Sequence, residues 1–161
     1  VTYYLVAYFV TTLGAFGIVT ILSGKDREAD SIDDYRGLAF HRPWLAALFT
    51  AILLSLAGIP LTAGFVGKFY IVAAGIGSAL WLLVVMLVLN SAVGLFYYLR
   101  VMVAMYLFIP EKEVQRVHAL SSRLSLSGGI VLAVLAFLLI WLGVYPSPLI
   151  HMIQTTVLSM Y

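Results

Sequence analysis

Charged residues are confined almost entirely to two short stretches of this chain, and long apolar runs separate them. Of the nine Lys and Arg residues, four lie within 25–42 and three within 112–123, which leaves Lys68 and Arg100 inside apolar runs. Charged residues make up 10% of the 161 residues, whereas an ordinary soluble domain carries about 25%. The sequence therefore predicts an all-α transmembrane protein surrounded by a lipid bilayer.

The composition also excludes several classes of function. The formal net charge of +2 sums two short polar loops and not a basic face, so nucleic acid is not an expected partner. The chain has no cysteine and cannot hold a cysteine-ligated zinc or iron–sulfur cluster. Since His41, His118 and His151 are far apart in the sequence, we expect no metal site from them.

The apolar runs predict four membrane-spanning helices, at residues 1–23, 44–76, 80–108 and 126–145, with polar loops at 24–43 and 110–125. The second span is expected to be discontinuous near 58–62, because Pro60 lacks a backbone donor and disfavours helical geometry at Ile59. One broken span places both basic loops on one side of the membrane, which the positive-inside rule makes the cytoplasmic side. The C-terminus is then expected on the opposite side.

The segments at the start and just after the end of the first apolar run support two further predictions. The opening segment VTYYLVAYFV has no basic residue ahead of it, unlike a signal peptide, and we interpret the chain as the tail of a longer protein.

In the loop at 24–43, Ser31 and Asp34 have the spacing of a capping box. The apolar residues of this loop, Ile32, Tyr35 and Leu38, then fall on one side of a helix. We expect a brief helix at the membrane interface.

Lys68 is the most informative residue, because it lies about eight residues past Pro60 and far from either end of its span. A lysine at such a depth costs about 2.5–3.5 kcal/mol, and charged residues inside a membrane usually have a function. The break supplies polar groups, since the carbonyls around Leu56 and Ala57 lose their helical partners and can accept from water or an ammonium. Gly58 and Pro60 therefore mark the predicted break, and Lys68 is the predicted proton-transfer residue.

The surroundings expected for Lys68 follow from the same break. Burial disfavours the ammonium while free carbonyls favour it, so this lysine can gain and lose a proton near neutral pH. Irregular backbone at membrane depth is buried in protein or lines a wet cavity, and we expect Lys68 and Pro60 to share such a cavity. Gly64 and Gly67 leave room on the same helix face for water or a neighbouring helix. The alternative is a structural ion pair between Lys68 and a carboxylate on another helix.

A candidate polar path accompanies this site and consists of Thr62, Asn90, Tyr97 and Arg100. Asn90, Gly94 and Tyr97 share one helix face, although residues at this spacing are more often helix-packing contacts. Arg100 does not lose its proton in proteins and lies roughly nine residues from the end of its span. We favour a structural role for Arg100.

Four stretches of the sequence resemble one known family. They are LSLAGIPLTAGFVGKFY (54–70), NSAVGLFYYLRV (90–101), TLGAFG (12–17) and DDYRGLAFHRPW (33–44). These stretches are similar to the antiporter-like membrane subunits of respiratory complex I, the proton-pumping NADH–quinone oxidoreductase, and most similar to the subunit N type. The subunit M type tends to carry glutamate at the position of Lys68, and the subunit L type continues into a long lateral helix. Multisubunit cation/proton antiporters share the module and are the main alternative.

The resemblance implies that the chain is part of a larger inverted-repeat bundle, with Lys68 as the proton-transfer residue of the broken helix. It also implies proton translocation across a bacterial inner membrane, coupled to electron transfer in other subunits of the complex. NADH, FMN, iron–sulfur clusters and quinone would bind in those partner subunits. This chain would then hold no cofactor and no metal, and it would act as one membrane subunit of a NADH:quinone oxidoreductase.

Overall fold

The described part of the chain is helical throughout. The structure, a computed structural model, describes residues 2–23, 31–60, 62–108 and 126–145, and no strand occurs among them. The long helices are α1 (Thr2–Leu22), α3 (Pro43–Ala57), α4 (Ala63–Gly77), α5 (Trp81–Tyr106) and α7 (Leu126–Val144). The 3-10 helix η1 (Ile32–Tyr35) and the short α2 (Leu38–His41) lie between α1 and α3. The predicted all-α class is confirmed for these residues.

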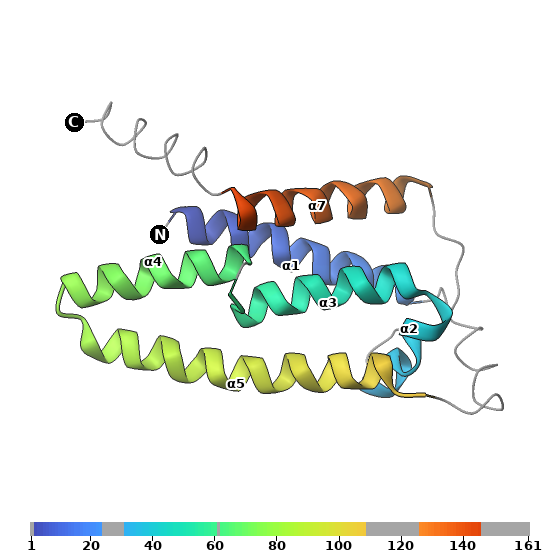
Figure 1. Cartoon of the computed structure of the whole chain (residues 1–161), viewed down its shortest axis with the longest axis horizontal. Helices are drawn as coiled ribbons and strands as arrows, with labels where there is room; N and C mark the ends of the chain where they lie inside the picture. Colours follow the sequence, from blue (N-terminus) through green and yellow to red (C-terminus); the bar gives the residue numbers. More distant parts are fainter. Residues whose placement is uncertain (1, 24–30, 61, 109–125, 146–161) are drawn as a thin grey trace.

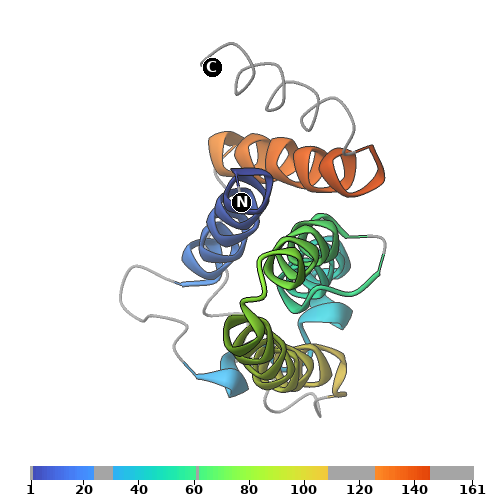
Figure 2. The same cartoon turned by 90° about the vertical axis from the view of Figure 1, so that its left-hand side faces the viewer.

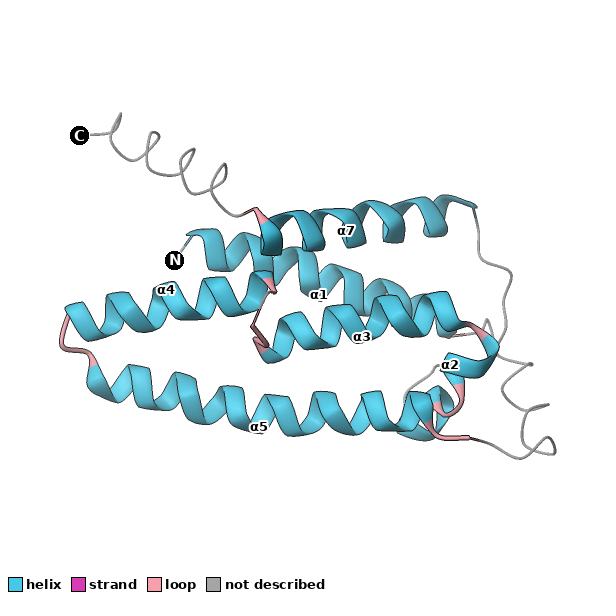
Figure 3. Cartoon of the chain, viewed as in Figure 1, coloured by secondary structure: helices cyan, strands magenta, loops and turns pink. Residues whose placement is uncertain are grey.

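Helices α3 and α4 together have the geometry of one interrupted helix. Figure 1 shows α4 continuing in the same direction as α3, while α5 runs back alongside both. In the end view of Figure 2, α4 lies in front of α3, so the two are roughly in line. Helix α1 contacts both halves and also packs against α7. Figure 3 shows the short non-helical link between the two halves.

Helix length separates the long helices into two groups. Helices α1 and α5 are long and apolar enough to cross a membrane, whereas α3, α4 and residues Gly129–Val144 of α7 form shorter apolar helices. Each half of the interrupted helix has 15 residues, or about 22 Å, which is short of a hydrocarbon core of about 30 Å. Either half alone is therefore too short to cross the hydrocarbon core, and the two halves can cross it only together. The number of crossings and the side occupied by each loop stay predictions.

Gly58 ends the first half of the interrupted helix. Its φ of 81° places it in the left-handed region, where its N–H donates to the carbonyls of Leu54 and Ser55, each at 3.1 Å. Glycine adopts this conformation without the strain that a side chain would add. The chain therefore turns out of α3 directly after Ala57.

Thr62 begins the second half. Its backbone is extended, and its Oγ1 accepts a hydrogen bond from the N–H of Phe65 at 3.4 Å while donating to the carbonyl of Ile59 at 2.7 Å. These contacts are those of a helix N-cap. The predicted interruption at 58–62 thus lies between a glycine C-cap and a threonine N-cap, with Pro60 between them.

The segment before α3 differs in part from its predicted form. The capping box is confirmed, since the N–H of Ser31 donates to Oδ2 of Asp34 at 3.1 Å. The prediction of one brief helix is wrong, because Gly37, at a φ of 68°, separates two short helices, η1 and α2. Tyr35 and Leu38 are buried, and the N–H of Gly37 donates to the carbonyl of Ala104 in α5 at 3.4 Å. This segment therefore packs onto the end of α5.

Two clusters of apolar side chains hold the helices together. The larger cluster joins α1, α3, α5 and α7 and includes the fully buried Ile18, Ile52 and Met105. The smaller cluster joins α1, α4 and α7, and there the hydroxyl of Tyr3 donates to the carbonyl of Leu142 at 2.7 Å. The predicted loop at 110–125, with His118, and the C-terminal tail, with His151, lie outside the described residues.

Candidate functional site

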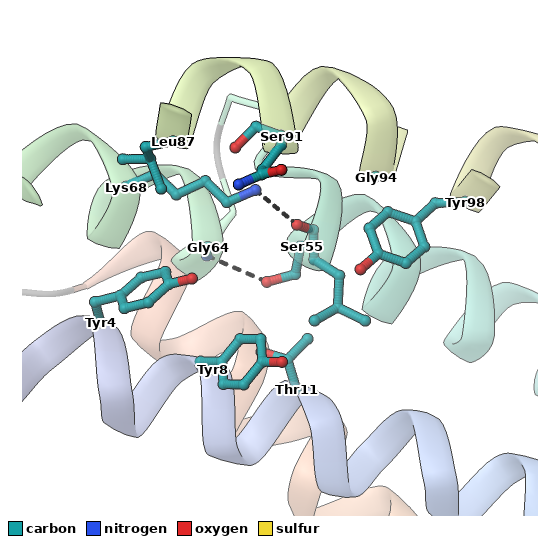
Figure 4. Close-up of a pocket in the computed structure, with 12 residues that line it drawn as sticks. Tyr4, Tyr8, Thr11, Ser55, Gly64, Lys68, Leu87, Ser91, Gly94 and Tyr98 are labelled. Atoms are coloured by element: carbon teal, nitrogen blue, oxygen red, sulfur yellow. Dashed lines mark hydrogen bonds between the residues drawn. The ribbon is translucent and has the colours of Figure 1, made fainter. Parts of the chain in front are cut away.

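The amine of Lys68 reaches from α4 back to the end of α3. Its Nζ donates to the carbonyl of Leu56 at 2.9 Å and to the carbonyl of Ala57 at 3.1 Å. Figure 4 shows the Lys68 side chain directed across the break toward the end of α3 that carries Ser55. Carbonyls in the last turn of a helix have no partner within the helix, so the lysine supplies what they lack. The carbonyls expected to accept from water or an ammonium thus accept from the ammonium of Lys68.

All four carbonyls in the last turn of α3 now have a donor. Those of Leu54 and Ser55 accept from the N–H of Gly58, and that of Leu54 also accepts from Ile59 at 3.1 Å. The remaining two accept from Lys68. The lysine therefore completes the C-cap of the helix half to which it does not belong.

Gly58 also makes room for the lysine. A Cβ atom at this position would lie 3.0 Å from Cδ of Lys68 and 3.2 Å from its Nζ. Such contacts are tighter than ordinary van der Waals distances, and they would fall on the part of the side chain that reaches the carbonyls. Glycine is therefore suited to position 58 both by its left-handed backbone and by its lack of a side chain.

Lys68 borders a cavity of about 150 Å³ between α1, α3, α4 and α5, which is room for several water molecules. Its lining consists of Tyr4, Tyr8, Thr11, Ser55, Leu56, Gly64, Lys68, Leu87, Asn90, Ser91, Gly94 and Tyr98. Most of these residues carry a hydroxyl or an amide, and among these described lining residues the lysine alone is charged. The amine therefore faces neutral hydrogen-bonding groups.

The cavity-facing side of α5 includes two of the residues singled out from the sequence. Asn90 and Gly94 line the cavity with Lys68, but Tyr98 and not Tyr97 completes that face. The α5 residues that line the cavity lie on the helix face that contains Gly94. Because successive residues are rotated by about 100° around a helix, Tyr97 lies at the edge of this face, away from the cavity. Tyr97 is 57% exposed and packs edge-on against Phe96.

The remaining predicted path residues lie elsewhere. Thr62 caps α4, as described above. Arg100 borders a second groove with Asp33 and Arg36 of the η1 segment, where the Asp33 carboxylate pairs with Arg36 at 2.9 Å. Pro60 is exposed and absent from the described lining of the Lys68 cavity, contrary to expectation. The carbonyl end of α3, and not the prolyl ring, faces the lysine.

Several lining residues were missed by reasoning from the sequence. Tyr4, Tyr8 and Thr11 of α1 follow one another at spacings of four and three residues, which places them on one helix face. The rings of Tyr4 and Tyr8 stack at 5.9 Å, and the hydroxyl of Thr11 donates to the carbonyl of Ala7. This spacing of hydroxyl groups in an apolar run was the available signal.

Gly64 and Gly67 of α4 allow close packing of neighbouring elements. A Cβ atom at Gly67 would lie 3.0 Å from Cδ2 and 3.1 Å from Cα of Tyr4, so Gly67 lets α1 approach. A Cβ atom at Gly64 would lie 1.8 Å from the carbonyl oxygen of Ser55. Both roles that the sequence left open are found, since Gly64 and Gly67 allow a close approach of neighbouring elements and Gly64 also lines the cavity. Among the described residues, no group of three potential metal ligands occurs.

Comparison with known proteins identifies the family. A sequence-family profile described as "NADH:quinone oxidoreductase/Mrp antiporter, TM" matches residues 1–94, which is more than half of the chain. The chain belongs to this family. As a member of this transmembrane antiporter family, it is part of a multi-pass membrane protein.

Individual relatives of this antiporter-family chain are named NADH-quinone oxidoreductase subunit N. The relative from Ectopseudomonas mendocina is 50% identical over 157 residues, covering 96% of this chain and 31% of its own length. The relative from Chromohalobacter salexigens is 52% identical over 153 residues, covering 94% of this chain and 32% of its own length. The chain thus spans about a third of these relatives. They confirm the resemblance to the subunit N type.

A solved structure shares the fold of this antiporter-family chain. It is "Respiratory complex I from Thermus thermophilus with bound Aureothin", matched with a TM-score of 0.73 at 28% sequence identity. The match covers 90% of this chain and 32% of the other. The arrangement of helices described above is therefore similar to one third of a chain in that complex.

Proposed function

We propose that this chain is part of a proton-translocating membrane subunit of a NADH–quinone oxidoreductase, and that Lys68 is its proton-transfer residue. One observation carries the proposal: a lysine amine inside a membrane protein rests on two helix-end carbonyls and borders a cavity whose lining includes hydroxyl and amide side chains. Relatives named subunit N support the choice of complex.

The geometry allows a proton to be exchanged while the side chain stays in place. An ammonium has three N–H groups, whereas a neutral amine keeps two N–H groups and a lone pair. The two carbonyl contacts use two N–H groups in either state, which leaves the third position for exchange with water in the cavity. Loss of that proton to water leaves the amine and a hydronium ion, and uptake reverses the step.

Two opposing effects set the balance between the two states. Burial away from water disfavours the ammonium, and the two carbonyl oxygens stabilise it. A change of charge nearby then alters the proton affinity of Lys68, since a tenfold change in this equilibrium needs only about 1.4 kcal/mol. Of the predicted path residues, we retain Asn90 as the polar neighbour that shares the cavity.

The coupling would come from outside this chain. NADH, FMN, iron–sulfur clusters and quinone would reside in partner subunits, and quinone reduction there would shift charge along the membrane toward Lys68. The protein would lie in a bacterial inner membrane, with the loops at 24–43 and 110–125 on the cytoplasmic side and the C-terminus on the other. The turn between α4 and α5 carries no Lys or Arg, whereas Arg36 and Arg42 follow η1 and α2 at the opposite end of these helices, which supports this orientation.

Two variants of Lys68 in the full-length protein, within its assembled complex, test the role. In inside-out membrane vesicles, Lys68→Ala is expected to lower proton translocation per NADH oxidised by about tenfold or more. Lys68→Arg keeps a cation and its donors but does not release a proton, so it should fail as well. Proton translocation at the wild-type level in Lys68→Arg vesicles, with loss in Lys68→Ala, would support a structural ion pair and contradict proton transfer.

A cation/proton antiporter is the second candidate, because the matching family description also names the Mrp antiporter. The full-length protein and its partners in sealed vesicles would then exchange sodium for protons without NADH or quinone. Sodium-driven proton movement that is lost in Lys68→Ala vesicles and is independent of NADH would favour this candidate. Movement that requires NADH and quinone favours the first.

A further inference from the structure

Ser55 joins the two halves of the interrupted helix at a second point. It lies in the last turn of α3 and is completely buried, at 0% exposure. Its Oγ accepts a hydrogen bond from the N–H of Gly64, in the first turn of α4, at 3.2 Å (Figure 4). A buried hydroxyl needs such a partner because leaving it unpaired is costly.

The two contacts across the break are reciprocal. N–H groups in the first turn of a helix lack partners within it, just as carbonyls do in the last turn. Ser55 of α3 satisfies one such N–H of α4, and Lys68 of α4 satisfies two such carbonyls of α3. Each half therefore caps the other.

The contact at Gly64 brings the two backbones together. A Cβ atom at Gly64 would lie 1.8 Å from the Ser55 carbonyl oxygen, so no side chain fits between them. Gly64 and Lys68 are four residues apart and lie one turn from each other on the same helix face. The position at which Ser55 holds Gly64 therefore sets the height and rotation from which Lys68 reaches its acceptors.

We propose that Ser55 is a positioning residue for proton transfer, which fixes the distance between the Lys68 amine and the two carbonyls. This inference rests on the proposed function of Lys68. The attraction between an ammonium and a carbonyl oxygen depends on their separation, so a displaced α4 changes the balance between ammonium and amine. Removing the Ser55 hydroxyl takes away the partner of the half-buried Gly64 N–H and releases the start of α4.

The test compares two hydroxyl deletions on α3 in the full-length protein within its assembled complex. Ser55→Ala is expected to displace the pH optimum of NADH-driven proton translocation by about half a unit or more and to lower the protons moved per NADH. Ser55→Thr keeps the hydroxyl and should restore the wild-type profile. Thr50→Val is the control, because the Thr50 hydroxyl donates to the Ala46 carbonyl at 2.7 Å and lies 3.3 Å from the Tyr106 hydroxyl of α5, neither of which is part of the contact with α4. Its profile should stay that of the wild type.

The outcomes separate this inference from the proposed function. An unchanged ratio and pH profile in Ser55→Ala, with loss of translocation in Lys68→Ala, overturns the role of Ser55 alone. Wild-type translocation in Lys68→Ala overturns both. If Ser55→Ala does not assemble, Ser55→Cys replaces it, since a thiol has a similar shape and accepts hydrogen bonds weakly. Failure of both variants to assemble would assign Ser55 to folding and overturn the inference.

Discussion

Helices α3 and α4 have the same length and similar apolar compositions, yet they are packed very differently. Each has 15 residues. In α3 the buried residues are Leu45, Ala46, Leu48, Phe49, Ile52, Leu53, Ser55 and Ala57, whereas in α4 they are Ala63 and Gly67. The half that supplies the acceptors is thus anchored in the core of the described residues, and the half that carries the amine is held mainly near its start.

This difference separates two kinds of sensitivity. Side chains such as Phe69 and Tyr70 on α4 are exposed in the described part of the chain, so truncating them removes few contacts there. Changes at the start of α4 alter the position of Lys68 instead. The comparison predicts that substitutions of the buried apolar side chains of α3 mainly lower stability, while substitutions at the contact between Ser55 and Gly64 also lower proton translocation.

The largest effect is expected from Gly64→Ala, which alters the junction, the contact between Ser55 at the end of α3 and Gly64 at the start of α4. The added methyl group would lie 1.8 Å from the Ser55 carbonyl oxygen, so the two backbones must separate, at a cost of about 3 kcal/mol or more. NADH-driven proton translocation in vesicles should be abolished. Gly77→Ala is the matched control, because a Cβ atom there meets nothing within 4 Å in the described residues; equal loss in both variants would show that the junction is not special.

The second effect tests the core of α3. Ile52→Ala removes a side chain that is 1% exposed and should destabilise the protein by about 2 kcal/mol, the low end for such changes, because lipid replaces water as the surroundings. The thermal unfolding midpoint of the purified complex measures this effect. Ile76→Ala on α4, where the side chain is 45% exposed, should leave the midpoint nearly unchanged. Similar midpoints for the two variants would contradict the contrast between the halves.

A third substitution sharpens the comparison at the C-cap. Gly58→Ala places a side chain at a φ of 81°, which costs about 1–2 kcal/mol, and crowds the Lys68 side chain as well. Part of the cost should disappear when Lys68 is itself replaced by alanine, since the crowded atoms are then absent. The double-mutant cycle in unfolding midpoint measures that coupling, and strictly additive effects would mean that Gly58 serves the backbone alone.

The smallest effect is expected at the N-cap of α4. Thr62→Ala removes the acceptor for the Phe65 N–H and should lower stability by about 1 kcal/mol, whereas Thr62→Ser should retain most of it. Unfolding midpoints and proton translocation should be measured on the same vesicle preparations. If Thr62→Ala loses translocation but not stability, Thr62 belongs to the polar path and not merely to the cap.

Much of the fold was accessible from the sequence because its signals are local. Pro60 and Gly58 predict the interruption, and the spacing of Ser31 and Asp34 predicts a capping box that is present. The split between η1 and α2 depends on the left-handed backbone of Gly37, which the spacing of the apolar residues does not indicate. Capping and helix-breaking residues therefore predict where the helices begin and end. They do not predict how many short helices the loop contains.

The site was only partly accessible, because it is assembled from four helices. The carbonyls that Lys68 contacts are free because of the break itself, and the sequence predicts them as acceptors for water or an ammonium. The lining by α1, and the choice of Tyr98 over Tyr97, depend on how helices rotate against each other. A single sequence gives each helix a polar face but does not say which faces meet.

The resting place of the amine has one further electrostatic consequence. Aligned peptide dipoles give a helix C-terminus a partial negative charge of about half an electron, and Lys68 sits on that end of α3. Unlike a carboxylate, this counter-charge belongs to the backbone and cannot be neutralised by acid. Among the described residues that line the cavity, a change of pH can therefore protonate or deprotonate Lys68 without removing the partial negative charge at the end of α3.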